Sequence, residues 1–229
     1  QTNAASVMGS NGPSMDSRTS RQIFEAIVRF ADRSTLNDLL QLFSGAVLRQ
    51  DIAWAVVQIA GEKAGPLLKD KLTSGGAMLE KHEYVRLTAV EGLRCLGNGF
   101  AVSALGEALH SSYGETVQQE AANALGAIGT NPSFAILEEL VHNQNTRSRR
   151  LGFVGIVHSQ HPRAIQVLFS TLSDPALLSG AMSNLLERGL DGEDALARGL
   201  QGADKPLRDA LLEEIQRRTS NKYEPQLSK

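Results

Sequence analysis

One pattern of apolar residues and glycine occurs several times along this chain, at intervals of about 30 to 36 residues. Two copies share five positions, which pair Val85 with Val117, Ala89 with Ala121, Leu93 with Leu125, Leu96 with Ile128, and Gly97 with Gly129. A period of this length is typical of helical repeat arrays. One short unit cannot bury both of its faces, so the repetition predicts units that stack and cover one another.

Further copies lie on both sides of this pair. The upstream copy matches at Ala53, Val57, Ala60 and Gly61, and the downstream copy matches at Ala181, Leu185 and Gly189. A fourth copy, between residues 149 and 172, keeps the length and the apolar spacing but carries "SQHP" where the others have glycine. We expect small residues such as Ala89, Ala121 and Ala181 to lie where the two helices of a unit cross closely.

Each copy divides into two helical patterns. The first half carries apolar residues at i, i+4, i+8 and i+11, which form one stripe on a helix. A turn containing glycine or proline follows, as in "GNG" and "GTNP", and these residues end helices. A second apolar pattern then begins, as in "AVSALGEAL". The alternation of period two that marks strands is absent, so we expect an all-α fold.

The domain limits follow from where the pattern begins and ends. We expect a polar N-terminal extension over residues 1–20, one repeat domain over 21–218, and a polar C-terminal tail over 219–229. Residues 21–44 and 205–218 are helical but lack the repeat signature, so they are expected to cap the array. The stretch "TSGGAMLEKHE" is expected to form a long loop between the first and second units.

The unit between Val85 and Leu109 resembles the HEAT-like repeat of the phycobilisome-lyase type, over residues 48 to about 200. Pattern and resemblance together predict a right-handed α-solenoid of about five HEAT- or armadillo-like two-helix repeats. The family includes E/F-type bilin lyases, phycobilisome-degradation proteins, a scaffold linked to iron–sulfur assembly, and organellar relatives. The resemblance therefore indicates the fold and leaves the function open.

Catalytic and metal-binding patterns are missing from the sequence. It has no Gly-x-Ser-x-Gly, no phosphate-binding glycine loop and no dinucleotide fingerprint. Deoxyhypusine hydroxylase, another HEAT-like array, binds iron through several His-Glu pairs, but here the pair occurs once, at His82, in the expected loop. His110 and His142 are expected at the ends of successive second helices, where the helix dipole favours histidine. We predict no catalytic residue, no metal and no cofactor.

Charge and composition bear on the class of partner. The net charge of −2 gives no basic footprint, and 5% aromatic residues give little surface for stacking on bases, so a nucleic-acid partner is not predicted. A HEAT-like nucleic-acid binder is kept only as a third alternative. Arg147, Arg149 and Arg150 form the one basic cluster. It is expected to be a solvated helix start, with an acidic partner surface as the alternative.

The single cysteine, Cys95, excludes an intrachain disulfide and favours a reducing compartment inside the cell. It lies on the apolar pattern, so we expect a small buried side chain. An organellar matrix or stroma is one expected location, with the cytoplasm as the other. No stretch of 18 apolar residues occurs, so no membrane span is predicted.

We therefore expect a non-catalytic protein-binding scaffold, a subunit or assembly factor of a larger complex whose other subunits are its partners. The side chains expected to meet that partner lie on second helices: Ser103, Glu107, Glu138, His142, Arg163 and Gln166. A partner chain is also expected to order the N-terminal tail. The alternative implied by the resemblance is a bilin lyase or chromophore-detaching factor that acts on phycobiliproteins, paired with a different lyase chain.

Overall fold

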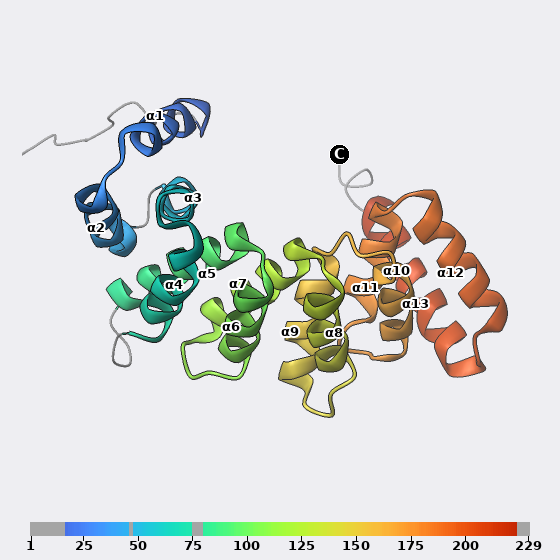
Figure 1. Cartoon of the computed structure of the whole chain (residues 1–229). Helices are drawn as coiled ribbons and strands as arrows, with labels where there is room; N and C mark the ends of the chain where they lie inside the picture. The colour runs from blue at the N-terminus through green and yellow to red at the C-terminus, as the bar shows by residue number, and fades with distance from the viewer. Residues whose placement is uncertain (1–16, 46–47, 75–79, 224–229) are drawn as a thin grey trace, which may run out of the picture.

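The computed structural model describes residues 17–45, 48–74 and 80–223, which form α-helices and short 3-10 helices and no strand (Figure 1). Five consecutive helix pairs make up the repeats. They are α3 (Arg49–Ala60) with α4 (Ala64–Thr73), α5 (Glu80–Leu96) with α6 (Gly99–Leu109), α7 (Glu115–Ile128) with α8 (Asn131–Val141), α9 (Thr146–Val157) with α10 (Ala164–Ser170), and α11 (Leu178–Glu187) with α12 (Leu190–Gly202). The predicted solenoid of about five two-helix units is confirmed.

Two helices precede the repeats and one follows them. They are α1 (Ser17–Phe30), α2 (Arg33–Gln41) with a 3-10 turn at Leu42–Ser44, and α13 (Lys205–Tyr223). Both end helices are longer than predicted, since α1 begins before residue 21 and α13 continues past residue 218. The first residues of α1 were not predicted as helix because their sequence is polar. Ser20 is nevertheless buried, and its hydroxyl donates to Asp51 of α3 over 2.9 Å.

Residues 1–16 and 224–229 lie outside the described part of the chain. The N-terminal tail that a partner chain was expected to order, residues 1–20, lies mainly outside the described residues. The segment expected as a loop between the first two units also differs from the prediction. Helix α5 already begins at Glu80, so His82 and Glu83 lie in its first turn and not in a loop.

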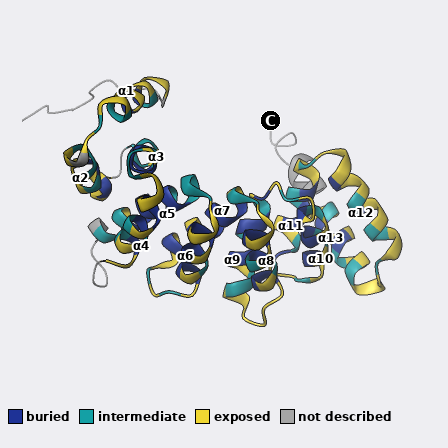
Figure 2. Cartoon of the chain, viewed as in Figure 1, coloured by how far each residue is buried: buried dark blue, intermediate teal, exposed yellow. Residues whose placement is uncertain are grey.

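The units stack side by side into an elongated, curved array (Figure 1). First helices pack in the order α3, α5, α7 and α9, and each second helix also packs against the first helix of the next unit. Buried residues follow the line between these two rows of helices, whereas exposed residues cover the outer sides (Figure 2). The core is therefore continuous along the array, as expected for units that cover one another's apolar faces.

Glycine ends the first helix in four of the five units. Gly61, Gly97, Gly129 and Gly189 have φ angles of 54°, 59°, 63° and 66°. Only glycine adopts this left-handed region without steric cost, so the shared glycine is explained by helix termination. The sequence interpretation of this position is confirmed.

The fourth unit ends its first helix by other means. In place of the missing glycine, Arg188 from the end of α11 reaches back to α9, and its Nη2 donates to the carbonyl oxygens of Val157 (3.1 Å) and Ser159 (3.0 Å). Burial lowers the pKa of this guanidinium, yet it stays charged because arginine titrates far above neutral pH. Arg188 thereby satisfies carbonyls left free at a helix end and ties the fifth unit to the fourth.

Small residues allow the helices to approach closely. The alanines at 89, 121 and 181 are all fully buried, but the close backbone approach of α7 and α9 uses glycines. A Cβ atom at Gly126 of α7 would lie 2.1 Å from the carbonyl oxygen of Gly155 on α9. Neither glycine belongs to the shared pattern, so this crossing was not predicted from the sequence.

Candidate functional site

The six side chains predicted to bind a partner lie along successive second helices. Ser103 and Glu107 belong to α6, and Glu138 belongs to α8. The other three lie at the C-cap of α8 (His142), at the N-cap of α10 (Arg163) and within α10 (Gln166). All are exposed except Glu138, which is half-buried. We call this set the second-helix row.

Ion pairs connect the second helices of neighbouring units. The Nζ atom of Lys69 on α4 lies 2.8 Å from a carboxylate oxygen of Glu107 on α6. Glu138 on α8 forms an ion pair with Arg163 at the start of α10. Exposed pairs of this kind contribute little to stability, but they neutralise charges that a partner would otherwise have to desolvate.

The structure brings three of the six residues together and leaves the others apart. His142 has its Nδ1 atom 2.8 Å from the carbonyl oxygen of Glu138, and Glu138 pairs with Arg163. Ser103, Glu107 and Gln166 make no contact with that group among the interactions of the described residues. The row is therefore a strip of separate polar side chains and not a converging site.

An aromatic contact at the α8–α10 junction was missed by the sequence analysis. The ring of His161 stacks on Phe134 with 4.0 Å between ring centroids and an interplanar angle of 16°. Its Nε2 atom lies 2.9 Å from Oδ1 of Asn131. The altered "SQHP" turn was the available signal, since it is where this copy departs from the others. These contacts hold the turn before α10 against α8.

The surface is hollowed on both sides of the array. On the first-helix side, a groove of about 410 Å³ crosses α3, α5 and α7, with Leu87, Glu91 and Asn123 among its lining residues. A cleft of about 870 Å³ opens on the second-helix side, between α10, α12 and α13, and Gln166 of the second-helix row lines it. The sequence indicated exposed second helices but neither hollow, because a hollow depends on how far adjacent helices stand apart.

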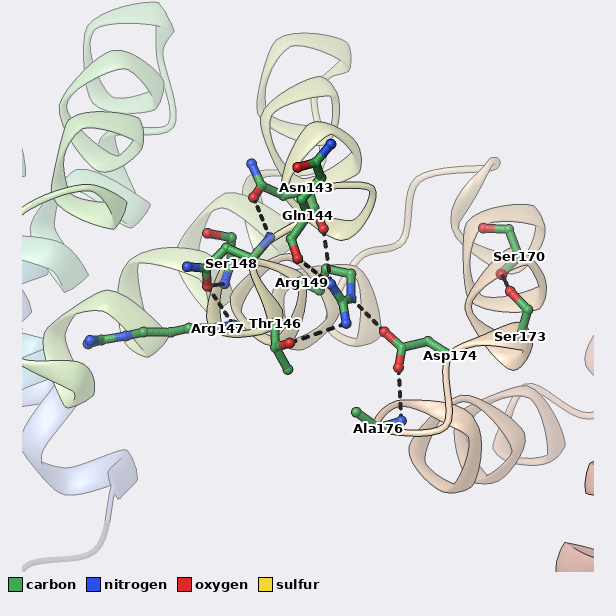
Figure 3. A network of polar contacts seen from close by, with 11 residues as sticks. Asn143, Gln144, Thr146, Arg147, Ser148, Arg149, Ser170, Ser173, Asp174 and Ala176 are labelled. Carbon is green, nitrogen blue, oxygen red and sulfur yellow. Dashed lines mark hydrogen bonds and ion pairs between the residues drawn. The ribbon is translucent and has the colours of Figure 1, made fainter.

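The basic cluster at the start of α9 is largely engaged by its own chain (Figure 3). Nε of Arg149 lies 2.6 Å from Oδ2 of Asp174, and its Nη1 donates to the carbonyl oxygen of Gln144. Nη2 of Arg147 donates to Oε1 of Gln118 over 2.7 Å. Arg150 is exposed. Two of the three arginines thus hold neighbouring units together, which weakens the alternative of an acidic partner.

The contact with Arg149 also affects the pKa of the Asp174 carboxylate. Burial raises its pKa, but the hydrogen bond from the Ala176 backbone amide and the ion pair with Arg149 outweigh that effect. The pKa of Asp174 therefore lies below its ordinary value of 3.8. Asp174 is ionised near neutral pH and links the α9 unit to the loop before α11.

Several other expectations concern chemistry and location. Among the described residues, no three His, Cys, Asp or Glu side chains gather closely enough to hold a metal ion.

Cys95 is half-buried against the core, and burial raises the pKa of its thiol, which keeps it protonated near neutral pH. Within the same part of the chain, every helix is too short or too polar to cross a membrane.

The match to a family model agrees with this architecture. Residues 76–155, about a third of the chain, match the family model described as HEAT repeats, over a range that includes most of α5 to α9. None of the curated proteins matches the chain. Matching solved structures include the crystal structure of an engineered protein from a structural genomics consortium. It is 18% identical, with a TM-score of 0.35, over 88% of this chain and 97% of that one.

Proposed function

We propose that this chain, a HEAT-like repeat protein, is a non-catalytic scaffold that binds another protein within a larger complex, along its second-helix row. The observation that carries the proposal is that five of these six polar side chains, all but Glu138, are exposed on or at the ends of the successive second helices α6, α8 and α10. Repeat arrays present extended surfaces of this kind, and binding is their usual role. The HEAT-repeat match over residues 76–155 supports the same conclusion.

The chemistry of the strip favours a partner with a mixed polar surface. Lys69–Glu107 and Glu138–Arg163 are already paired, so neither sign of charge dominates. Ser103, His142 and Gln166 offer hydrogen-bonding groups between these pairs. A partner would gain specificity by matching this order of groups, whereas buried apolar area would supply most of the affinity.

Purification of the tagged chain from its native source tests this proposal. We expect it to elute with a second protein at a fixed ratio, and we expect the doubly substituted variant Ser103→Arg, Gln166→Arg to elute alone. The control, Gln58→Arg, places one arginine on an exposed position of α3 on the first-helix side. Recovery of the unsubstituted chain only as a free monomer would contradict the proposal.

The bilin-lyase alternative gives a different result in a separate measurement. A lyase or chromophore-detaching factor would change the visible spectrum of a mixture with phycocyanobilin and a phycobiliprotein subunit, in the presence of a paired lyase chain. The scaffold proposal expects an unchanged spectrum. A chromophore transferred or released in that mixture would overturn it in favour of catalysis.

A further inference from the structure

The second-helix row ends beside an apolar cleft. Gln166 of α10, the last member of the row along the chain, is exposed and also lines the cleft between α10, α12 and α13. Another hollow, of about 1050 Å³, lies between α2 and α4, but none of the six row residues lines it. A partner that contacts Gln166 therefore meets the α10–α12–α13 cleft along the same surface.

Half-buried apolar side chains from three helices form the walls of this cleft. They are Ile165 and Phe169 of α10, Ala195 of α12 and Leu207 of α13, and each also packs against the core. All six members of the second-helix row are polar, so the row itself offers hydrogen-bonding groups and no apolar side chain. Because burial of apolar surface is the main favourable term when proteins associate, the cleft is where a partner on this row can gain affinity.

Two glycines of α12 keep the cleft open. A Cβ atom at Gly199 would lie 1.9 Å from the ring of Phe169, so the ring lies directly on the α12 backbone and forms a flat wall. Gly202 also lines the cleft, and no atom lies within 4 Å of the position that its Cβ would occupy. The resulting cleft of about 870 Å³ has room for a large side chain of a partner.

Charges around the cleft indicate the chemistry of the segment that fits it. Asp191 and Asp204 line it together with Arg198, so carboxylates outnumber guanidinium groups there. Asp191 is exposed and has no hydrogen bond or ion pair within the described part of the chain. Asp204 uses one carboxylate oxygen to accept from the backbone amide of Leu207. A lysine or arginine next to the inserted side chain would complement these carboxylates.

We propose that the partner bound along the second-helix row inserts a large apolar side chain, flanked in its sequence by lysine or arginine, into the α10–α12–α13 cleft. This inference rests on the proposed scaffold function, because Gln166 belongs to both surfaces. It adds the source of the affinity, whereas the polar row supplies specificity. A single side chain buried in a pocket commonly carries a large share of the binding energy of an interface.

A charge inside the cleft tests the insertion. The partner recovered with the tagged chain is identified by mass spectrometry, produced separately and titrated against purified variants by calorimetry. Ala195→Glu should lower the affinity by about tenfold or more, because its carboxylate would be buried against the apolar side chain. The matched control is Ala197→Glu, at an exposed position of α12 that does not line the cleft, and it should leave the affinity unchanged. Equal losses in the two variants would contradict insertion at this cleft.

Asp191 tests the charge of the inserted segment and leaves the apolar walls intact. Asp191→Lys should weaken binding at low salt, and the loss should shrink at high salt, because ions screen exposed charges. The matched control is Glu193→Lys, which makes the same change in the same first turn of α12 at a position that does not line the cleft. An affinity that stays the same or rises in Asp191→Lys would overturn the expected lysine or arginine.

The outcomes distinguish this inference from the scaffold function on which it rests. Recovery of the chain only as a free monomer contradicts both. A partner that is lost from the Ser103→Arg, Gln166→Arg variant but binds Ala195→Glu at full strength contradicts the insertion alone.

A photoreactive leucine analogue in place of Ala195 identifies the occupant of the cleft in the native complex. The crosslinked peptide should belong to the partner and contain a large apolar residue beside a lysine or arginine. A crosslink to a second copy of this chain would overturn the proposal. A small molecule found in the cleft by native mass spectrometry of the complex would overturn it as well.

Discussion

Arg188 illustrates what a single residue does in this array. In four of the five units a glycine of positive φ ends the first helix, and the exception is the unit formed by α9 and α10. Arg188 takes over the carbonyl oxygens that remain free at that helix end, from a position 31 residues after Val157. The missing glycine is visible in the sequence, where "SQHP" takes its place. The role of Arg188 is not predictable from the sequence, because the donor comes from the next unit and no local spacing marks it.

Replacing Arg188 with methionine should lower the free energy of unfolding by about 1–3 kcal/mol, because partly buried carbonyl groups lose their donor. Urea denaturation followed by circular dichroism measures this change. Arg198→Met is the matched control, since Arg198 is exposed and its Nε donates only within its own helix; we expect it to cost less than about 0.5 kcal/mol. Equal effects of the two substitutions would show that Arg188 does not stabilise the α9 end.

The Asp174 carboxylate makes a contribution that depends on pH. Its pKa in the folded protein lies below the ordinary value of 3.8, so its stabilising effect is complete above that value and is lost as the pH falls through the folded pKa. Asp174→Asn should therefore cost about 1–2 kcal/mol at neutral pH, and the difference should shrink below a pH of about 4. Denaturation at several pH values tests this, with exposed Asp209→Asn on α13 as the control. A gap that stays constant with pH would contradict the expected role.

At the scale of helices, much of the architecture was predictable from the sequence. The repeated stripe gave the helix pairs and their order, because burial of one face per helix follows directly from apolar spacing. The packing distances were not predictable in the same way. Gly126 and Gly155 set the closest crossing of α7 and α9, and a glycine in a helix interior is equally consistent with a surface position.

Substitution of Ala121 with phenylalanine tests the helix packing inferred from the repeat. Ala121 is fully buried in α7, so the larger ring should overpack the core and lower the free energy of unfolding by about 1–3 kcal/mol. The matched control is Ala127→Phe, at an exposed position of the same helix. Thermal melts compare the two proteins. An unchanged melting temperature for Ala121→Phe would reject the proposed register.

At the scale of the whole molecule, the array offers two sides and two ends. Second helices present a strip of polar side chains, and first helices present a groove across α3, α5 and α7. The sequence could indicate which second-helix residues are exposed, since they fall between apolar positions. It could not predict the groove or the cleft, because these depend on the curvature of the stacked units (Figure 1).

The most direct test of the scaffold account is site-specific photo-crosslinking in the native source. A photoreactive amino acid at Ser103 or Gln166 should attach the partner that co-purifies with the chain. The same amino acid at Glu120, an exposed residue lining the first-helix groove, should not. Mass spectrometry of the adducts identifies the attached protein at each position. The account predicts one protein crosslinked from both second-helix positions, and crosslinks obtained only from Glu120, or from none of the three, would contradict it.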